Sequence, residues 1–326
     1  MRLLVEAPVC AGLLRTERDD DILLAALVVR KRFTIGPQGG LAEPQPEAAQ
    51  AAIRYEALPL GVYGELPPGE IPPRTGTDVI VLGDAICAEP TIATRVEVRV
   101  GDYAVDLDVF GERRWESVLG ALVPSDPAPF VRMPITYKNA YGGSSSTSEY
   151  GPTPWFKNPV GKGYYLHASE AKGAALPNVE SPSHKIQRWD DRPPPAGLAP
   201  YPAQWGLRWE QFIEVLPESE KIDVHPDRGM YDRAHPWLAG KPVTGGPMRV
   251  AGMSPSPVTF ELPPCPVEAH IQVGATKATR DLELEEILVD MRELVVDLTW
   301  RKMFRYPFIK HERREVRVVP RSDASR

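Results

Sequence analysis

Proline is the residue that most restricts how this chain can fold. It accounts for 36 of the 326 residues, about 11% against a usual share of about 5%. Because proline removes a backbone donor and fixes φ, this density disfavours long helices and long uninterrupted strand ladders. We therefore predict a mostly β fold, with antiparallel sheets (sandwich or barrel-like), few short helices, and long ordered loops rich in proline, glycine and aromatic residues.

Hydrophobic periodicity places the strands of the N-terminal part. Residues 22–35 are apolar on both faces at the start and polar on one face at the end, which predicts a largely buried strand. Residues 78–88 contain a second, short buried strand. In residues 95–110, apolar and charged residues alternate on both sides of Gly101-Asp102, which is typical of a β-hairpin. We expect Gly101 to have a positive φ in this turn.

The C-terminal part contains further strand patterns. Residues 258–262 and 270–273 are typical of strands, and residues 315–319 predict one more strand at a sheet edge. Residues 282–295 fit a helical stripe or two strands, and we favour strands around a turn at residues 290–293. We expect a single large β-rich domain over residues 1–319, with an N-terminal sheet and hairpin (1–125), a long-loop region (126–240) and a C-terminal β portion (241–319). A disordered tail (320–326) would follow.

Residues 132–165 combine glycine, proline and aromatic residues without a helical or strand period. They read R-M-P-I-T-Y-K-N-A-Y-G-G, then a serine-rich insert, then W-F-K-N-P-V-G-K-G-Y-Y. This composition predicts an ordered loop, which we call the central loop, and long ordered loops are usually functional. The residues that we expect to shape it or to bind a partner are Arg132, Pro134, Tyr137, Gly142, Gly143, Trp155, Asn158, Pro159, Gly161, Gly163, Tyr164 and Tyr165.

Two interpretations of the central loop remain open. In the first, Arg132 satisfies several backbone carbonyls and Asn158 caps a turn with its amide, so that both residues only hold the loop in place. In the second, these residues contact a partner directly. The aromatic residues Trp155, Tyr164 and Tyr165 either present their rings to that partner or pack them inside the protein.

The most concentrated set of chemically capable residues lies between Asp223 and His235. It also contains His225, Asp227, Tyr231 and Asp232. Two histidines and three carboxylates could bind a metal, but their spacing matches no zinc or calcium pattern, so a structural polar loop is favoured.

Two other patterns are incomplete. Gly161-Lys162 lacks the remaining residues of a phosphate-binding loop, and the serines at 144–146 lack a G-x-S-x-G motif, which favours a flexible polar insert. We therefore expect no enzyme activity, no cofactor and no bound metal.

Charge and cysteine content exclude several classes of partner. The formal net charge of −6 provides no field that would attract nucleic acid. The three cysteines lie far apart, which is typical of reduced thiols. Neither a signal peptide nor a membrane-spanning apolar run is recognisable, so we expect a cytoplasmic protein that binds neither nucleic acid nor membrane.

Seven short motifs occur in an order that resembles one bacterial family. They are V-R-K-R-F-T-I at 29–35, G-T-D-V-I-V-L-G at 76–83, V-F-G-E-R-R-W at 109–115, R-M-P-I-T-Y-K-N-A-Y-G-G at 132–143, N-P-V-G-K-G-Y at 158–164, L-P-N-V-E-S-P at 176–182 and D-R-P-P-P-A-G-L at 191–198. The family was long filed as a domain of unknown function. Its members are encoded beside PAAR-like spike-tip proteins and toxic effectors in type VI secretion loci.

The resemblance implies an effector adaptor or co-chaperone. Such a protein would bind an effector that carries a PAAR-like domain and would assist its loading onto the VgrG spike protein. The family carries no known catalytic residues, so none is implied here. Two alternatives stay open at this stage: a hydrolytic enzyme that uses the loop from Asp223 to His235, and a carbohydrate-binding β module, because aromatic-rich loops on β scaffolds also suit sugars.

Overall fold

The largest sheet joins strands from both ends of the chain. The computed structural model describes residues 1–16, 22–36, 39–43, 56–68, 72–146, 151–216, 221–307 and 313–321. The strand order of this sheet is β2-β3-β26-β25-β7, and β4 pairs with the end of β3. The bounds are β2 Cys10–Thr16, β3 Ile22–Ile35, β4 Leu41–Ala42, β7 Asp78–Leu82, β25 Glu283–Asp290 and β26 Val295–Pro307. All pairs are antiparallel except β25 with β7.

Two further sheets complete this part of the molecule. A five-stranded sheet has the order β18 (Val179–Glu180), β10 (Tyr103–Phe110), β9 (Ala93–Val100), β21 (Gly246–Ala251) and β22 (Val258–Leu262). A four-stranded sheet has the order β1 (Arg2–Val5), β27 (Arg314–Pro320), β23 (Val267–Val273) and β24 (Thr276–Arg280). All three sheets contribute to one hydrophobic core, which gives a sandwich-like arrangement. The predicted mostly β fold is confirmed.

The strongest periodic segments fold as predicted. The buried part of β3 spans Ala25–Arg30, where apolar residues occupy both faces. The hairpin of β9 and β10 pairs Val100 with Tyr103, and Gly101 has a φ of 50°. Strands β25 and β26 are connected by a turn, so the strand interpretation of residues 282–295 is confirmed.

The prediction of an edge strand at residues 315–319 is wrong in its placement. Strand β27 lies between β23 and β1, because the N-terminal strand pairs with it in parallel and Arg2 lies opposite Glu315. The alternation in β27 cannot reveal that partner, which comes from the other end of the chain. The strand extends to Pro320, and the Arg321 N–H donates to Pro266 O at 2.9 Å. Residues 322–326 of the expected tail lie outside the described residues.

The remaining elements are short. The two-stranded sheets pair β5 (Leu58–Pro59) with β6 (Glu65–Leu66), β8 (Asp84–Thr91) with β13 (Phe130–Pro134), β11 (Trp115–Val118) with β12 (Ala121–Pro124), β14 (Tyr141–Gly142) with β17 (Lys162–Gly163), β15 (Ser144–Ser145) with β16 (Thr153–Pro154), and β19 (Ile213–Leu216) with β20 (Lys221–Val224). The helices are α1 (Ala168–Ala171), α2 (Gly206–Phe212) and the 3-10 turns η1 (Gly61–Tyr63), η2 (Tyr137–Asn139), η3 (Pro226–Arg228) and η4 (Pro236–Leu238). Within the described ranges, no helix has the length and apolar content needed to cross a bilayer.

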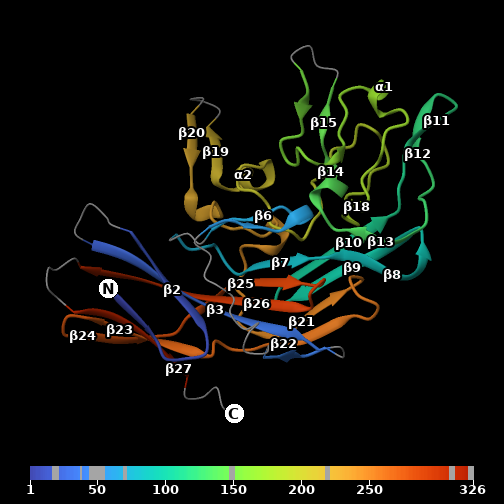
Figure 1. Cartoon of the computed structure of the whole chain (residues 1–326). Coiled ribbons are helices and arrows are strands. Elements are labelled where there is room, and N and C mark those ends of the chain that lie inside the picture. The colour runs from blue at the N-terminus through green and yellow to red at the C-terminus, as the bar shows by residue number, and fades with distance from the viewer. Residues whose placement is uncertain are drawn as a thin grey trace.

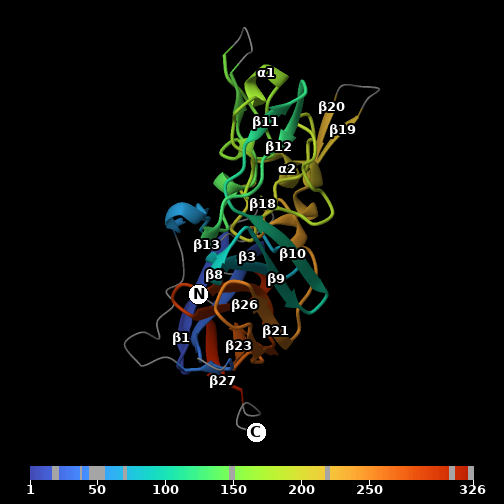
Figure 2. The same ribbon diagram turned by 90° about the vertical axis from the view of Figure 1, so that its right-hand side faces the viewer.

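The molecule has a sheet-built base and a loop-rich distal end (Figure 1). The N-terminus and the last described strand, β27, lie in the base, and the hairpins β11–β12, β15–β16 and β19–β20 project at the opposite end together with α1 and α2. The same separation is visible after a quarter turn (Figure 2). The distal end has its own hydrophobic cluster, formed by Trp115, Tyr141, Tyr164, Ala171, Leu176 and Ile186, with Leu122, Trp155, Tyr165 and Trp189 packed against it.

Candidate protein-interaction surface

Asn158 is the centre of the central loop. Its side chain is completely buried, and its Nδ2 donates to Tyr137 O at 2.8 Å and to Tyr141 O at 2.9 Å. Its own carbonyl accepts the N–H of Gly143 at 2.8 Å. The amide therefore ties η2, β14 and the following turn together, in agreement with the interpretation that Asn158 holds the loop in place.

Close backbone approach around Asn158 explains the glycines of the loop. A Cβ on Gly142, whose φ is 153°, would lie 2.1 Å from Asn158 O. Gly161 has no positive φ, but its Cβ would lie 2.4 Å from Asn158 Nδ2. Gly142 pairs with Gly163 in the parallel ladder of β14 and β17. Two other predicted loop-shaping residues, Gly143 and Pro159, also lie beside Asn158. The Gly143 N–H donates to Asn158 O, and half-buried Pro159 directly follows Asn158 in the chain.

The aromatic rings of the loop pack inside the protein. Half-buried Trp155 stacks on Tyr164 at a centroid distance of 5.1 Å and meets the edge of Tyr141 at 6.1 Å. The Tyr165 hydroxyl donates to Ala175 O at 3.0 Å. Tyr137 instead packs into the core of the base, where its hydroxyl donates to Ala199 O at 3.0 Å and burial raises the pKa of that hydroxyl. Of the two interpretations, the structure favours rings that form the scaffold of the distal end.

Arg132 and Pro134 lie in strand β13 and not in irregular chain. Strand β13 pairs with β8, so backbone partners come from the ladder. The Arg132 guanidinium forms an ion pair with buried Asp84, which also accepts the hydroxyl of Tyr63. Arg132 therefore contacts a carboxylate, and the expectation that it satisfies several backbone carbonyls is wrong. Sequence spacing could not reveal this contact.

The expected flexible insert at residues 144–146 is wrong. Ser145 is completely buried, and its Oγ donates to the Glu170 carboxylate at 2.6 Å. The same carboxylate accepts the N–H and Oγ of Ser146 at 2.7 and 3.0 Å and the N–H of Leu166 at 3.2 Å. Burial raises the pKa of Glu170, but these hydrogen bonds outweigh it and lower the pKa to about 2. Residues 147–150 of the insert lie outside the described residues.

The structure does not bring the residues between Asp223 and His235 together. Asp223 and Asp227 are exposed on β20 and η3, His225 and Tyr231 are half-buried, and the Asp232 carboxylate accepts Thr75 N–H at 2.8 Å. His235 is completely buried, with Nε2 at 3.0 Å from Pro195 O and Nδ1 accepting Trp237 N–H at 3.2 Å. Burial lowers the pKa of His235 to about 3, so the ring is neutral. In the chain as described, no group of three or more His, Cys, Asp or Glu side chains could hold a metal ion.

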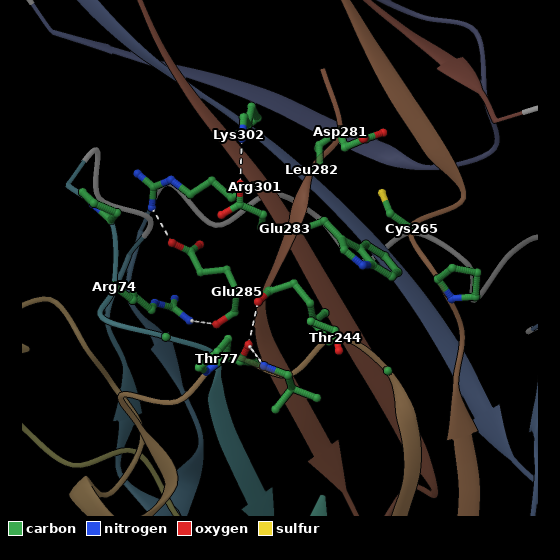
Figure 3. A pocket seen from close by; sticks show the side chains of 18 of the residues that line it. Arg74, Thr77, Thr244, Cys265, Asp281, Leu282, Glu283, Glu285, Arg301 and Lys302 are labelled. Carbon is green, nitrogen blue, oxygen red and sulfur yellow. Dashed lines mark hydrogen bonds and ion pairs between the residues drawn. The ribbon is translucent and has the colours of Figure 1, made fainter. Parts of the chain in front are cut away.

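A cavity of about 680 Å³ lies in the base beside β25 and β26 (Figure 3). Charged side chains on its wall pair with one another: Arg301 Nη1 with Glu285 Oε1 at 2.7 Å, and Lys302 Nζ with Glu283 Oε1 at 2.7 Å. Arg74 at its floor donates to the Glu285 carbonyl at 3.1 Å. The wall charges thus serve to connect strands, and the sequence carried no signal for this cavity because its lining comes from distant segments.

Exposed apolar side chains concentrate at the distal end. Of the 17 large apolar side chains that are exposed in the described chain, ten lie there. They are Val118, Leu119, Val123, Phe156, Val160, Leu166, Trp209, Val215, Ile222 and Val224. We call these ten residues the distal surface. Six of them form two groups, Val118, Leu119 and Val123 in the β11–β12 hairpin and Val215, Ile222 and Val224 in the β19–β20 hairpin, and grouped apolar exposure marks interaction sites more often than scattered single residues do.

Leu119 stands out within the distal surface. It occupies the turn of the β11–β12 hairpin, its side chain is completely exposed, and its φ is 51°, followed by 86° at Gly120. Positive φ at both central residues suits Asn-Gly, whereas a leucine there costs about 1–2 kcal/mol. Leu119 therefore combines a strained backbone with an apolar side chain that has no role in the core, a combination that is typical of functional positions.

Sequence reasoning did not predict the two hairpins that carry most of the distal surface. A signal was present for β19–β20, because I-E-V at 213–215 and I-D-V at 222–224 alternate around a polar turn. For β11–β12 no such signal is present, because W-E-S-V at 115–118 and A-L-V-P at 121–124 do not alternate.

The described fold defines a β-rich scaffold with a separate distal end that displays apolar hairpins. A family model described as an uncharacterized protein conserved in bacteria, DUF2169, matches residues 21–301. This match covers most of the chain, so the chain belongs to the DUF2169 family. No curated protein and no solved structure matches it.

Proposed function

We propose that this protein is an effector adaptor, or co-chaperone, of a type VI secretion system. In this proposal it binds an effector that carries a PAAR-like domain and assists the loading of that effector onto the VgrG spike protein. The observation that carries the proposal is the distal surface, whose hairpins β11–β12 and β19–β20 carry exposed apolar side chains at the end of the molecule opposite the sheet-built base. The seven motifs that resemble a family encoded in type VI secretion loci supply the identity of the client.

The physical task of such an adaptor is to cover apolar or strand-edge surface on the client until assembly. Uncovered strand edges and apolar patches on a free effector would otherwise lead to aggregation. The distal hairpins can cover both kinds of surface. In the described chain, β11–β12 and β19–β20 are two-stranded sheets with open edges that can pair with a strand edge, and their exposed β-branched side chains can contact an apolar patch. The distal cluster supports the β11–β12 hairpin, because Trp115 and Leu122 belong to it.

The alternative functions receive less support from the geometry. A carbohydrate-binding module needs exposed rings, and in the central loop Tyr141 and Tyr164 are buried and Trp155 is half-buried, which leaves Phe156 and Trp209 as the exposed rings of the distal surface. A hydrolase built on the loop from Asp223 to His235 needs convergent side chains, and the structure separates them. No observation therefore favours either alternative over the adaptor.

The test is co-expression of the full chain with the PAAR-like-domain protein encoded in the same locus, followed by size-exclusion chromatography. We expect co-elution, and a lower soluble yield of that protein when the chain is absent. The triple variant Val118→Thr, Leu119→Asn, Val123→Thr is expected to weaken co-elution, whereas Val62→Thr, which changes an exposed valine outside the distal surface, is expected to leave it unchanged. Separate elution of the two wild-type proteins at micromolar concentration would refute the proposal.

A further inference from the structure

The β19–β20 hairpin has one apolar face that is largely exposed in the described chain. The register pairs Ile213 with Val224 and Val215 with Ile222, which places these four side chains on the same face. The exposed fractions are 58% for Val215, 58% for Ile222 and 50% for Val224. Such a row of β-branched residues normally packs against a core or a second sheet.

The hairpin is also isolated as a sheet. Strands β19 and β20 pair only with each other among the described strands, so each leaves one backbone edge without a strand partner. A two-stranded hairpin alone is marginally stable in water, and this one is held at its base, where α2 packs against β19 and the His225 N–H donates to Phe212 O at 2.7 Å. A supported hairpin with a bare apolar face and open edges is suited to receive an extended segment.

Three carboxylates, Glu214, Asp223 and Asp227, lie on or beside the hairpin, together with the cations Lys221 and Arg228. Glu214 and Asp223 lie opposite each other on the other face. Glu214 pairs with Arg228 Nη1 at 3.2 Å, whereas Asp223 and Asp227 are exposed and have no ion-pair partner within the described ranges. A basic segment would complement these carboxylates, and like charges on a second copy of this chain would oppose self-association.

We propose that the β19–β20 hairpin binds an extended segment of the client in which β-branched apolar residues alternate with lysine or arginine. The segment adds to an open edge of the hairpin, so its apolar residues extend the face of Val215, Ile222 and Val224 and its basic residues lie on the other face beside Asp223. Strand β27, the last described element, lies at the opposite end of the molecule (Figure 1). This inference rests on the proposed function, which supplies the client.

The experiment measures the dissociation constant of the full chain for the PAAR-like-domain protein of the same locus. The double variant Val215→Thr, Ile222→Thr keeps β-branched side chains and removes apolar contact, and we expect it to weaken binding by about tenfold or more. Val62→Thr is the matched control, because Val62 is also 58% exposed. Asp223→Lys should weaken binding at about 0.05 M salt and much less at about 0.5 M, where charges are screened.

The outcomes separate the two proposals. If the wild-type complex forms and neither the double variant nor Asp223→Lys weakens it, the hairpin proposal is wrong and the adaptor proposal stands. If the wild-type complex does not form, the adaptor proposal fails. A synthetic peptide of alternating valine and lysine then decides the hairpin: binding to the wild type but not to the double variant supports it, and binding to neither refutes it. Self-association that the double variant abolishes, detected by analytical ultracentrifugation, would also refute it.

Discussion

Substitution of Asn158 tests whether the distal end is held together as the structure shows. Asn158→Ala removes the two hydrogen bonds from Nδ2 to Tyr137 O and Tyr141 O. Each buried hydrogen bond contributes about 1 kcal/mol net, and an acceptor that loses its donor adds about 1–3 kcal/mol. The loss is offset in part, because Oδ1 of Asn158 has no hydrogen-bond partner among the described residues and disappears as well. We expect the free energy of unfolding to fall by about 3 kcal/mol.

Asn158→Asp makes the test sharper. The aspartate keeps the shape of the side chain but turns a carboxylate oxygen toward two carbonyl oxygens in a completely buried site. Burial of an unpaired charge costs more than loss of the hydrogen bonds alone. The expected order of stability is therefore wild type, then Asn158→Ala, then Asn158→Asp. Lys138→Ala, an exposed change in the same loop, should stay within about 0.5 kcal/mol of the wild type.

The assay is urea-induced unfolding followed by tryptophan fluorescence at pH 7. Trp155 accepts the N–H of Asn158 with its carbonyl, and three of the seven tryptophans, Trp115, Trp155 and Trp189, lie in the distal cluster, so the emission includes this region. An aspartate variant that is more stable than the alanine variant would show that the amide does not donate to these carbonyls.

Four further predictions follow from single contacts. Gly101→Val should lower the free energy of unfolding by more than about 1 kcal/mol, seen as a lower melting midpoint, because its φ of 50° strains a β-branched residue. Leu119→Asn should raise stability by about 1 kcal/mol in the same assay, since asparagine adopts positive φ more easily; a lower midpoint would contradict this. The pKa of His235 falls from 6.5 to about 3 on folding, so its stability contribution is present above pH 6.5 and is lost as the pH drops toward 3. Urea midpoints of the wild type should decline over that range more steeply than those of His235→Asn. Glu170→Gln should lower the midpoint at pH 7, and its difference from the wild type should shrink as the pH falls from 4.5 to about 2, where the wild-type carboxylate also becomes protonated.

Local patterns predicted the parts of the fold that local interactions determine. The β9–β10 hairpin is closed by two residues, so alternation and Gly101 suffice to define it. The same holds for β25 and β26, where one turn separates the two strands. Strand β27 shows the limit, because its outer partner β1 lies at the other end of the chain and no local period reports on it.

The candidate site was harder to predict because polar side chains find partners across long sequence separations. Glycine, asparagine and tyrosine in the central loop correctly indicated an ordered structure. The sequence around Ser145 is typical of a polar insert, and its hydrogen bond to Glu170, 25 residues away, leaves no local pattern. The aromatic rings were recognised as important, and only the structure places Trp155 against Tyr164 and not in solvent. The exposed apolar residues of the two distal hairpins, and not these rings, form most of the distal surface, and they lie outside the central loop.

The pairing of strands from the two chain ends sets the order in which this protein can fold during synthesis. Strand β3 needs β26 as a neighbour and β1 needs β27, so the base has a high contact order and cannot close until the last strand has left the ribosome. The residues of the distal cluster, in contrast, all lie between Trp115 and Trp189 and are complete much earlier. A nascent chain therefore contains every residue of the distal cluster while β3 still lacks its partner β26. Removal of β27 would leave β1 and β23 without the strand that lies between them.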